Sequence, residues 1–590
     1  MVTSRLDNLL TWGKQNGVKW PREVDFVENT DRGVAGVANK EISSATFEVP
    51  SDLIIRGALA KCFFNVDSNL NTWLKLLVAK LKFDPSPTVV ESQNLNEKFG
   101  PYIDALPREV DSPLVWNPAE LLELGNSNLR SSLPMKLKSI FHEWRGAVEQ
   151  LQNQLNTGER VQEEFDSIQQ LVAEGDEEHI YQEITSKVFD DELNLPWTSF
   201  PAFLWSHLVF LSRAFPEHIL TPEVDPSSVI LLPIVDLLNH SYNSKVEWSN
   251  AHNSFSVTKL ERTREGQEIF NNYGGKGNEE LLVGYGFVLE ENIFDTAALK
   301  IKLPLAAILR LQTETSIKLP TMLDYTTSAF EVSSGRKIPS GNENELSQYE
   351  DGLLYLLSTS NSTCLEWLLD LFAWLGKNLA ESHLSLRTRL QGLQNLRAAI
   401  EDKYGSLKAV SSRPLTVYTA KDYRVRSARI YKSGQLRILK DAINELKRTE
   451  KRWTAHHKQH TLTVSKILRD DPNFFEEELP RILQSNTDDE IELDSYHDLL
   501  FMWVTCKVQY QSIPKDIQWV TSQYDKFLQT HANEPDLISE DVKKVHAKVF
   551  FNDPNKLMLR PLAAAVAFVE ASSYTRLSND EMILVQDTDL

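Results

Sequence analysis

Two short segments near the middle of the chain gather side chains that could take part in chemistry. The first, residues 233–241 (PIVDLLNHS), is apolar and then presents three polar side chains: Asp236, Asn239 and His240. The second, residues 266–287, carries three aromatic side chains next to glycines: Tyr273, Tyr285 and Phe287. A phenol keeps its proton at neutral pH, so Tyr273 is predicted to orient a reacting group rather than to act as a base. Aromatic faces attract cations, which favours a cationic ligand.

Each segment also has an ordinary structural interpretation. Asn and His are common where strands end in turns, and a tyrosine in a strand commonly packs on a neighbour. The run at residues 274–277 (GGKG) is similar to a phosphate-binding loop, but Gly277 stands where such a loop has Ser or Thr. A nucleoside triphosphatase is therefore excluded. The occurrence of both segments together favours a functional site.

Predicted strands and helices must position these segments. Residues 229–238 are apolar and rich in branched side chains, which predicts a buried strand, although Pro233 limits its pairing. Two further strands are predicted at residues 255–258 and 268–272, with a turn at residues 264–267 before the second. Residues 200–215 predict a strongly apolar helix, and another helix is predicted to start at Asn278. Arg213 lies on the apolar helix, where a guanidinium needs an anionic partner.

The rest of the chain is predicted to be mostly helical. The pattern is helical from residue 53 to about 195 and again from about residue 303 nearly to the C-terminus. A β-hairpin region is predicted at residues 31–50. Two short helices are predicted at residues 6–12 and 433–446, and two loops at residues 334–341 and 485–490. Ser433 is predicted to cap the second of these helices. The pattern indicates a mixed α+β domain with a helical insertion, followed by an all-helical domain.

Size and charge bound the class of the protein. A chain of 590 residues is too long for one core, so at least two domains are expected. The formal net charge of −21 disfavours general binding of nucleic acid and would attract basic proteins, although it would also serve solubility alone. Residues 421–452 are locally basic and are predicted to be a solvated helix face, with contact to ribosomal RNA as the alternative.

Cysteines and apolar runs exclude further classes. The three cysteines, Cys62, Cys364 and Cys506, lie far apart and predict neither a disulfide framework nor a structural zinc site. The first ten residues carry charges where a signal peptide would be apolar. The most apolar run, residues 200–215, is too short and too interrupted to span a bilayer. We expect a soluble, intracellular protein.

Together the two segments resemble the signature of the SET-domain lysine methyltransferases, in the branch typified by the plant Rubisco large-subunit methyltransferase. The resemblance is carried by residues 239–240 (NH), 273–274 (YG), 278–282 (NEELL) and 285–287 (YGF). It implies an α+β SET domain over residues 1–300 with a helical insertion at about 55–200. An all-α substrate-binding domain over residues 301–590 is implied to follow. Three stretches look most like the fungal ribosomal lysine methyltransferases: residues 102–108, 200–208 and 271–293.

The resemblance also implies roles for the polar residues of the two segments. Asn239 and His240 would contact the adenine of S-adenosylmethionine, and Asp236 would orient their loop. Tyr273 would be the catalytic residue, located where the cofactor and the target amine meet. Its hydroxyl would help to place the amine and would stabilise positive charge near the transferred methyl group.

Further cofactor contacts follow from the same resemblance. Tyr285 and Phe287 would form the aromatic wall of the cofactor and lysine channel. Arg213 would face the carboxylate of the cofactor, with an internal salt bridge as the alternative. The turn at residues 32–38 (RGVAGVA) would contact the methionine part through the backbone of Gly33 and Val34. The family usually has a second glycine where this chain has Ala35, and here the glycine comes one place later, at Gly36.

The implied activity is mono- or dimethylation of a lysine on a basic protein of the large ribosomal subunit. S-adenosylmethionine would be the methyl donor, and no metal is expected. A lysine on an elongation factor, a protein histidine, and a non-catalytic binding scaffold are the alternatives. We expect a monomer in the cytoplasm, the nucleus or both, without contact to membranes.

Overall fold

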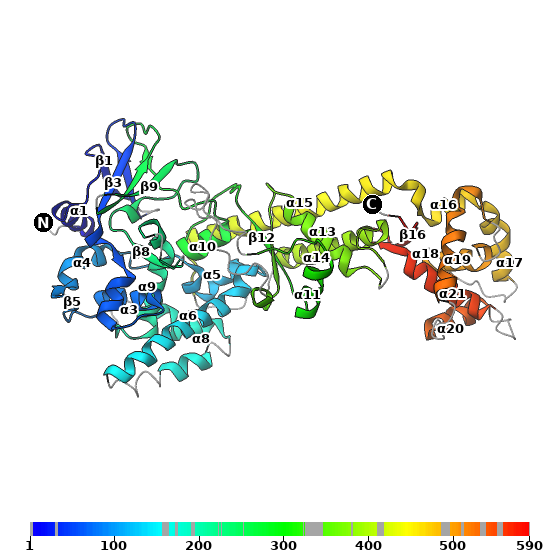
Figure 1. Cartoon of the computed structure of the whole chain (residues 1–590), viewed down its shortest axis with the longest axis horizontal. Coiled ribbons are helices and arrows are strands. Elements are labelled where there is room, and N and C mark those ends of the chain that lie inside the picture. Colours follow the sequence, from blue (N-terminus) through cyan, green and yellow to red (C-terminus); the bar gives the residue numbers. More distant parts are fainter. Residues whose placement is uncertain are drawn as a thin grey trace. The chain divides into compact units, whose positions relative to one another are not determined.

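The computed structural model of the chain contains two compact units (Figure 1). The first comprises residues 1–298, 321–348 and 407–436, and the second comprises residues 299–320, 349–406 and 437–590. The structure describes residues 4–29, 33–155, 164–171, 175–189, 195–221, 224–225, 227–251, 253–321, 324, 346–378, 381–409, 418–484, 496–508, 513–531, 538–550 and 558–588. The loops predicted at residues 334–341 and 485–490 lie outside the described residues.

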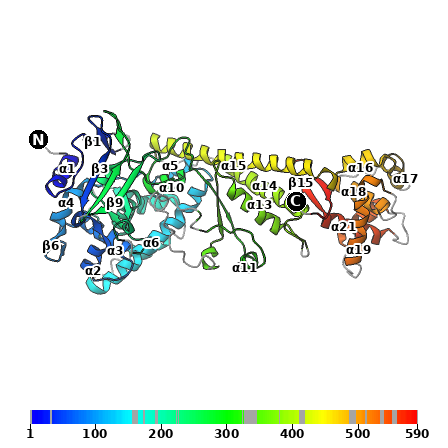
Figure 2. The same cartoon turned by 45° about the horizontal axis from the view of Figure 1, so that its top comes forward.

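Besides the short antiparallel pair of β5 (Val89–Val90) and β6 (Gln93–Asn94), three antiparallel sheets of three strands form the β part of the first unit (Figure 2). One contains β1 (Val24–Asn29), β2 (Gly33–Ala38) and β11 (Glu268–Ile269), in that order. Another has β10 (Ser254–Lys259) between β3 (Ala45–Pro50) and β9 (Val246–Ala251). The last has β8 (Val229–Leu231) between β4 (Ile55–Arg56) and β7 (Ala214–Pro216). These pairings bring the N-terminal strands to both segments that carry the candidate chemistry.

The β-hairpin predicted over residues 31–50 is wrong in its pairing. β2 pairs with β1, a strand that the sequence pattern did not indicate, and β3 belongs to a different sheet. In β1 the alternation of apolar and polar side chains is broken, because Val27 is 43% exposed and Glu28 beside it is exposed as well. A strand is difficult to recognise without alternation, since period two is its main sequence signal.

The apolar run at residues 229–238 is buried as predicted, but only its start is a strand. β8 ends at Leu231, before Pro233, which has no N–H to donate to a ladder. Ile234 then adopts a φ of 71°, in the left-handed region, so the chain turns. A 3-10 turn at Val235–Leu237 leads directly to Asn239 and His240.

Helices make up most of the remaining first unit. α1 (Arg5–Gln15), α9 (Phe200–Arg213) and α10 (Asn278–Tyr285) confirm three predicted helices. The predicted helical region between about 53 and 195 contains α2 (Gly57–Phe64), α3 (Leu70–Phe83), α4 (Leu95–Ala105), α5 (Pro118–Glu123), α6 (Asn128–Leu155) and α8 (Glu177–Glu183). α9 is apolar on nearly all sides because it is buried: Phe200, Trp205 and Leu208 have no exposed surface.

The second unit is mainly helical, but it is not all-α as predicted. Its helices include α11 (Leu305–Glu314), α13 (Thr363–Leu375), α14 (Leu386–Lys408), α16 (Val464–Asp470), α17 (Leu479–Gln484), α18 (Tyr496–Trp503), α19 (Trp519–His531), α20 (Glu540–Val549) and α21 (Leu559–Ser572). A sheet of β14 (Thr461–Leu462), β16 (Glu581–Val585) and β15 (Ser573–Arg576) accompanies them, and β13 (Leu353–Leu357) pairs with β12 (Ala297–Ile301). Apolar runs this short do not distinguish a strand from a buried helix by periodicity. The α+β class itself is confirmed.

α15 (Asp422–His456) contains the helix predicted at residues 433–446 but starts well before it. Ser433 is therefore inside the helix and does not cap it. Ser433 is exposed, where a serine side chain meets solvent and disturbs a helix little. Leu439, Ile443 and Leu446 are buried, which confirms most of the predicted apolar stripe.

The basic stretch at residues 421–452 is a solvated face, as predicted, with one exception. Most of its basic side chains are exposed: Lys421, Arg426, Arg429, Arg437, Lys440, Lys447, Arg448, Lys451 and Arg452. Arg424 is instead buried, at 4% exposure. A buried guanidinium requires anionic partners, so Arg424 has a different role from its neighbours.

Candidate active site

The two chemically dense segments lie side by side in the first unit. The N–H of Asn271 donates to the carbonyl of Asn239 over 2.8 Å, and the N–H of Ser241 donates to the carbonyl of Asn271 over 3.0 Å. His240 and Asn271 form an isolated parallel bridge. The backbone therefore brings residues 239–241 and 271–273 together, although about thirty residues separate them in the chain.

Tyr273 is the centre of an aromatic stack. Its ring is stacked on His240, with centroids 5.0 Å apart, and on Tyr285, with centroids 4.9 Å apart. Its hydroxyl donates to the carbonyl of Leu238 over 2.8 Å, and its N–H donates to Nδ1 of His240 over 3.0 Å. The ring and the hydroxyl of Tyr273 are thus both fixed by residues of the first segment.

Burial decides the protonation states in the stack. Burial raises the pKa of Tyr273 above its ordinary value of 10, and burial likewise raises the pKa of Tyr285. Burial, with the nearby charge of Lys276, lowers the pKa of His240 to about 4. Both phenols therefore keep their protons at neutral pH and His240 is neutral. Because Nδ1 of His240 accepts the N–H of Tyr273, the ring proton of His240 is assigned to Nε2.

α10 and the turn after it place Tyr285 and Phe287. The helix ends at Gly286, which has a φ of 78°. Phe287 then lies edge-on to Tyr285, with centroids 6.2 Å apart, and 6.5 Å from the ring of His240. Unlike residues of the core, Tyr273, Tyr285 and Phe287 are only partly buried. The stack is therefore accessible to a ligand.

Arg213, at the end of α9, forms the internal salt bridge that was the alternative to a cofactor contact. Its Nη1 donates to the backbone carbonyl of Asp236 over 2.9 Å and lies 3.2 Å from Oδ2 of Asp236. The hydroxyl of Tyr102 donates to the same Oδ2 over 2.9 Å. The side chain of Asp236 has no exposed surface. Burial raises the pKa of Asp236, against the opposing effect of Arg213.

Asn239 connects β2 and β11 to the site. Its Nδ2 donates to the carbonyl of Val34 over 3.2 Å and to Oε1 of Glu268 over 2.7 Å. Val34 thus faces the first segment through its backbone. The Asn239 side chain is held by protein groups, so its contact with a ligand would use its backbone or require exchange of these bonds.

The glycine turn departs from the family pattern without disturbing the sheet. Gly33 has a φ of 73°, and a Cβ built on it would meet nothing within 4 Å, so space is open beside it. Ala35 is buried and pairs with Val27. A Cβ on Gly36 would lie 3.0 Å from Cδ2 of Leu238. Gly36, one place after the position of the family's second glycine, is therefore the residue that lets β2 approach the first segment closely.

Three residues that sequence reasoning missed support this arrangement: Tyr102, Glu268 and Asn271. Tyr102 and Glu268 hold Asp236 and Asn239, as described above. Asn271 is 1% exposed, and its Nδ2 has no hydrogen-bond partner among the described residues. The only sequence signal for Asn271 was the polar pair that it forms with Asn272 directly before Tyr273.

Two classes of feature are not found in the described part of the chain. No three or more His, Cys, Asp or Glu side chains there are grouped so that they could hold a metal ion. No helix there is long and apolar enough to cross a membrane.

Comparisons with known proteins found relatives among the protein-lysine methyltransferases. The EFM1 middle domain family matches residues 305–457. Ribosomal lysine N-methyltransferase 1 of Saccharomyces cerevisiae is 41% identical over 99% of this chain and 100% of its own length. Protein-lysine N-methyltransferase EFM1 of the same yeast is 27% identical over 85% of this chain and 83% of its own.

A solved structure shares the fold. Rubisco LSMT bound to AdoMet matches 82% of this chain and 100% of its own, with a TM-score of 0.52 and 18% sequence identity. The predicted SET-domain fold is thereby confirmed. With an identity of 41% along the whole chain, the protein belongs to the family of SET-domain protein-lysine N-methyltransferases.

Proposed function

We propose that the protein transfers methyl groups from S-adenosylmethionine to a lysine of a large-subunit ribosomal protein, adding one or two. The observation that carries the proposal is the 41% identity to a yeast ribosomal lysine N-methyltransferase over the whole of both chains. The net charge of −21 supports a basic substrate, because an acidic surface attracts basic proteins and speeds their encounter. Ribosomal proteins are made in the cytoplasm and assembled in the nucleus, so we place the enzyme in one or both.

The residues of the site fit the proposed methyl donor. Space is open beside Gly33, and the rings of Tyr273 and Tyr285 offer aromatic faces, which attract a cation such as a sulfonium. Arg213 uses only Nη1 in its bonds with Asp236, so its other nitrogens would hold a carboxylate. When bound, S-adenosylmethionine supplies an electrophilic methyl group on its sulfonium.

The remaining polar contacts of the donor come from the first segment and β2. The backbone of Val34, Asn239 and His240 would hold it, and Phe287 would close the aromatic wall. Asp236 would act indirectly, by fixing Arg213 and the turn before Asn239.

Tyr273 is proposed to orient the target amine. Its hydroxyl proton is donated to Leu238, so the phenol oxygen can only accept a hydrogen bond from another group. An N–H of the lysine amine is such a donor. Because burial raises the pKa of Tyr273, the phenol does not remove a proton from the amine. Its contribution is position, held by the stack and by Leu238 before substrate arrives.

A second candidate function keeps the reaction and changes the acceptor. The observation behind it is the match of residues 305–457 to the EFM1 middle domain, because EFM1 is named as a protein-lysine N-methyltransferase and not as a ribosomal one. A lysine of an elongation factor or a protein histidine would be that acceptor. The two candidates differ in substrate and share every residue of the proposed site.

The experiment uses purified protein, isotopically labelled S-adenosylmethionine and ribosomal proteins from cells that lack the enzyme. Mass spectrometry then locates the label. We expect label on one lysine of a large-subunit protein, strongly reduced with Tyr273→Phe and unchanged with Tyr524→Phe, which removes a hydroxyl from α19 in the second unit. Donor binding without label on any ribosomal protein would exclude the ribosomal substrate, and a panel of elongation factors would follow. A label on histidine would exclude lysine as acceptor.

A further inference from the structure

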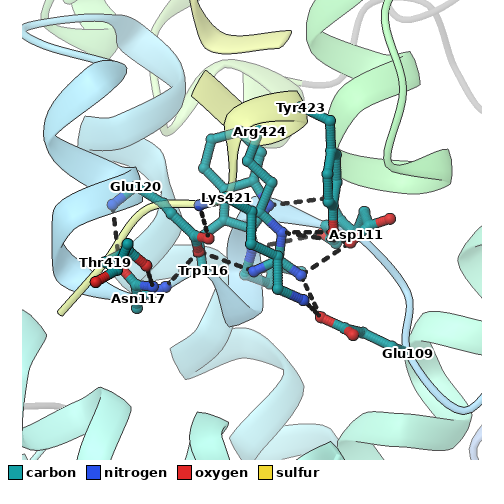
Figure 3. A network of polar contacts seen from close by, with 11 residues as sticks. Glu109, Asp111, Trp116, Asn117, Glu120, Thr419, Lys421, Tyr423 and Arg424 are labelled. Carbon is teal, nitrogen blue, oxygen red and sulfur yellow. Dashed lines mark hydrogen bonds and ion pairs between the residues drawn. The ribbon is translucent and has the colours of Figure 1, made fainter. Parts of the chain in front are cut away.

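Residues 418–436 belong to the same compact unit as the candidate active site, whereas the chain on both sides of residues 407–436 belongs to the other unit. This part of the chain includes the first half of α15. Figure 3 shows that the start of α15 meets the short segment that runs from Glu109 to Glu120. About 300 residues separate these two segments in the sequence, so their contact is a long-range feature of the fold.

Arg424 is the centre of this contact, and we name it with its three carboxylate partners the Arg424 clasp. Nη2 of Arg424 donates to Oε1 of Glu109 over 2.5 Å and to Oδ1 of Asp111 over 2.8 Å. Nη1 donates to Oε2 of Glu120 over 2.8 Å. The side chain of Arg424 is 5% exposed and that of Glu120 is fully buried. Removing one member of a buried ion pair leaves an uncompensated charge, so these groups hold each other strongly.

Neighbouring residues add to the clasp. The hydroxyl of Tyr423 donates to Asp111, and Nζ of Lys421 lies 2.5 Å from Glu109. The N–H of Lys421 donates to Oε1 of Glu120 over 3.1 Å. The side chains of Glu109 and Asp111 are therefore both bound by residues of α15 or by Lys421, the residue before it.

Asp111 connects the clasp to the aromatic stack. A Cβ added to Gly286 would lie 2.9 Å from Cβ of Asp111 and 3.0 Å from its carbonyl carbon. The hydroxyl of Ser112 donates to the carbonyl of Val283, in α10, over 2.7 Å. Gly286 separates Tyr285 from Phe287, so the backbone of Asp111 rests on the turn that carries both rings.

α15 also holds the other end of α10. The hydroxyl of Tyr431 donates to Oε2 of Glu279 over 2.8 Å. Nε2 of Gln435 donates to the carbonyl of Thr296 over 2.6 Å. α10 is thus bound at its start by α15 directly and at its end by α15 through Asp111.

We infer that Arg424 is a positioning residue for methyl transfer, which acts through Asp111 on the Gly286 turn and so fixes Tyr285 and Phe287 against Tyr273. The inference rests on the proposed role of this stack as the methyl-transfer site. Arg424 touches neither donor nor lysine. Its effect is on the geometry of the wall, and a displacement of a fraction of an ångström there lowers the rate of a reaction that depends on alignment.

A purely structural role makes a different prediction. If Arg424 only stabilised the fold, its loss would increase the unfolded fraction, and each molecule that still binds donor would turn over normally. Turnover per donor-binding site, with sites counted by titration with S-adenosylmethionine, separates the two roles because unfolded enzyme is not counted. Hydrogen exchange of the peptide covering residues 281–289 reports the turn without any substrate.

The variants are Arg424→Met, Arg424→Lys and the matched control Arg426→Met. Arg426 is in the same helix, but its side chain is 75% exposed, and its ion pair is with the exposed Glu290. We expect Arg424→Met to lower turnover per site about 10- to 100-fold, with donor affinity changed less than about threefold. Exchange of residues 281–289 should rise, while the control stays within about twofold of the wild type. Arg424→Lys keeps the positive charge but loses the planar guanidinium with its several donors, so its turnover should lie between those of Arg424→Met and the wild type.

Gly286→Ala tests the same contact from its other side. Its Cβ would meet Asp111, and the φ of 78° is unfavourable for alanine. Combined with Arg424→Met it should cost less than the product of the two single effects, because both act on one contact. Should Arg424→Met fail to fold, Arg424→Lys and Gly286→Ala, alone and combined, provide the same double-mutant cycle.

Two outcomes would overturn the inference: normal turnover per site with unchanged exchange at residues 281–289, or single effects that multiply in the double variant. A wild type that binds donor but labels no ribosomal protein would refute the proposed substrate alone. The exchange measurement would then still decide the role of Arg424.

Discussion

Replacing Tyr273 by phenylalanine isolates the hydroxyl from the ring. Phenylalanine keeps the aromatic faces that stack on His240 and Tyr285, so the donor-binding wall is retained. It removes the hydrogen bond to the carbonyl of Leu238, a residue that is 2% exposed. A buried carbonyl that loses its donor costs about 1–3 kcal/mol, so Tyr273→Phe should be less stable by that amount in urea denaturation.

The kinetic effect of Tyr273→Phe should be larger than its effect on binding. The loss of one preorganised polar group at a reacting centre lowers turnover about 10²- to 10³-fold, equivalent to about 3–4 kcal/mol. Donor affinity, measured by calorimetry, should change less than about threefold because the ring contacts remain. Single-turnover kinetics at saturating donor and substrate gives the rate of the chemical step. Equal single-turnover rates in variant and wild type would refute the proposed role of the hydroxyl.

Three further predictions concern residues around the stack and the stability of the fold. Asn239→Ala should weaken donor binding about tenfold, because its amide ties two strands to the site; unchanged affinity in calorimetry would contradict this. Arg213→Met should destabilise the protein by about 3 kcal/mol in denaturant, because it leaves the buried carboxylate of Asp236 without its cation, whereas exposed Arg426→Met should cost less than about 0.5 kcal/mol. Burial would raise the pKa of Glu143, but bonds from a histidine and a lysine lower it from 4.5 to about 2. A lowered pKa contributes stability above pH 4.5 that is lost as pH falls towards 2, so Glu143→Gln should flatten the stability curve between about pH 5 and 2, by up to about 3 kcal/mol; parallel curves would disprove the contribution.

Strongly periodic elements could be predicted from the sequence, and those defined by distant pairing could not. α9 was predictable because it is apolar over many residues, and α10 because residues 278–282 (NEELL) resemble a stretch typical of the family. β1 was not predicted, because the apolar Val27 faces solvent and interrupts the alternation of apolar and polar residues. β15 and β16 escaped because runs of four and five residues carry too little periodicity.

The aromatic members of the site could be predicted, whereas most of their polar partners could not. Tyr273, Tyr285 and Phe287 stand beside glycines in a recognisable order, and the structure brings them into one stack. Tyr102 and Arg424 belong to segments whose local patterns indicate only helices. Their roles depend on which surfaces meet after folding, and no local spacing records that.

The position of the buried charges explains why the methyl-transfer wall depends on so much of the chain. Short motifs supply the rings, but two aromatic side chains joined by a glycine have no rigidity of their own, because glycine is the most flexible residue. Rigidity at Gly286 has to come from a backbone packed against it, which is that of Asp111. Asp111 itself lies in a segment without regular secondary structure, so a charged partner must hold it. Arg424 is that partner, and it belongs to a helix. Each step replaces a flexible element by a more rigid one, and we therefore expect the rate of methyl transfer to be sensitive to residues far from the motifs.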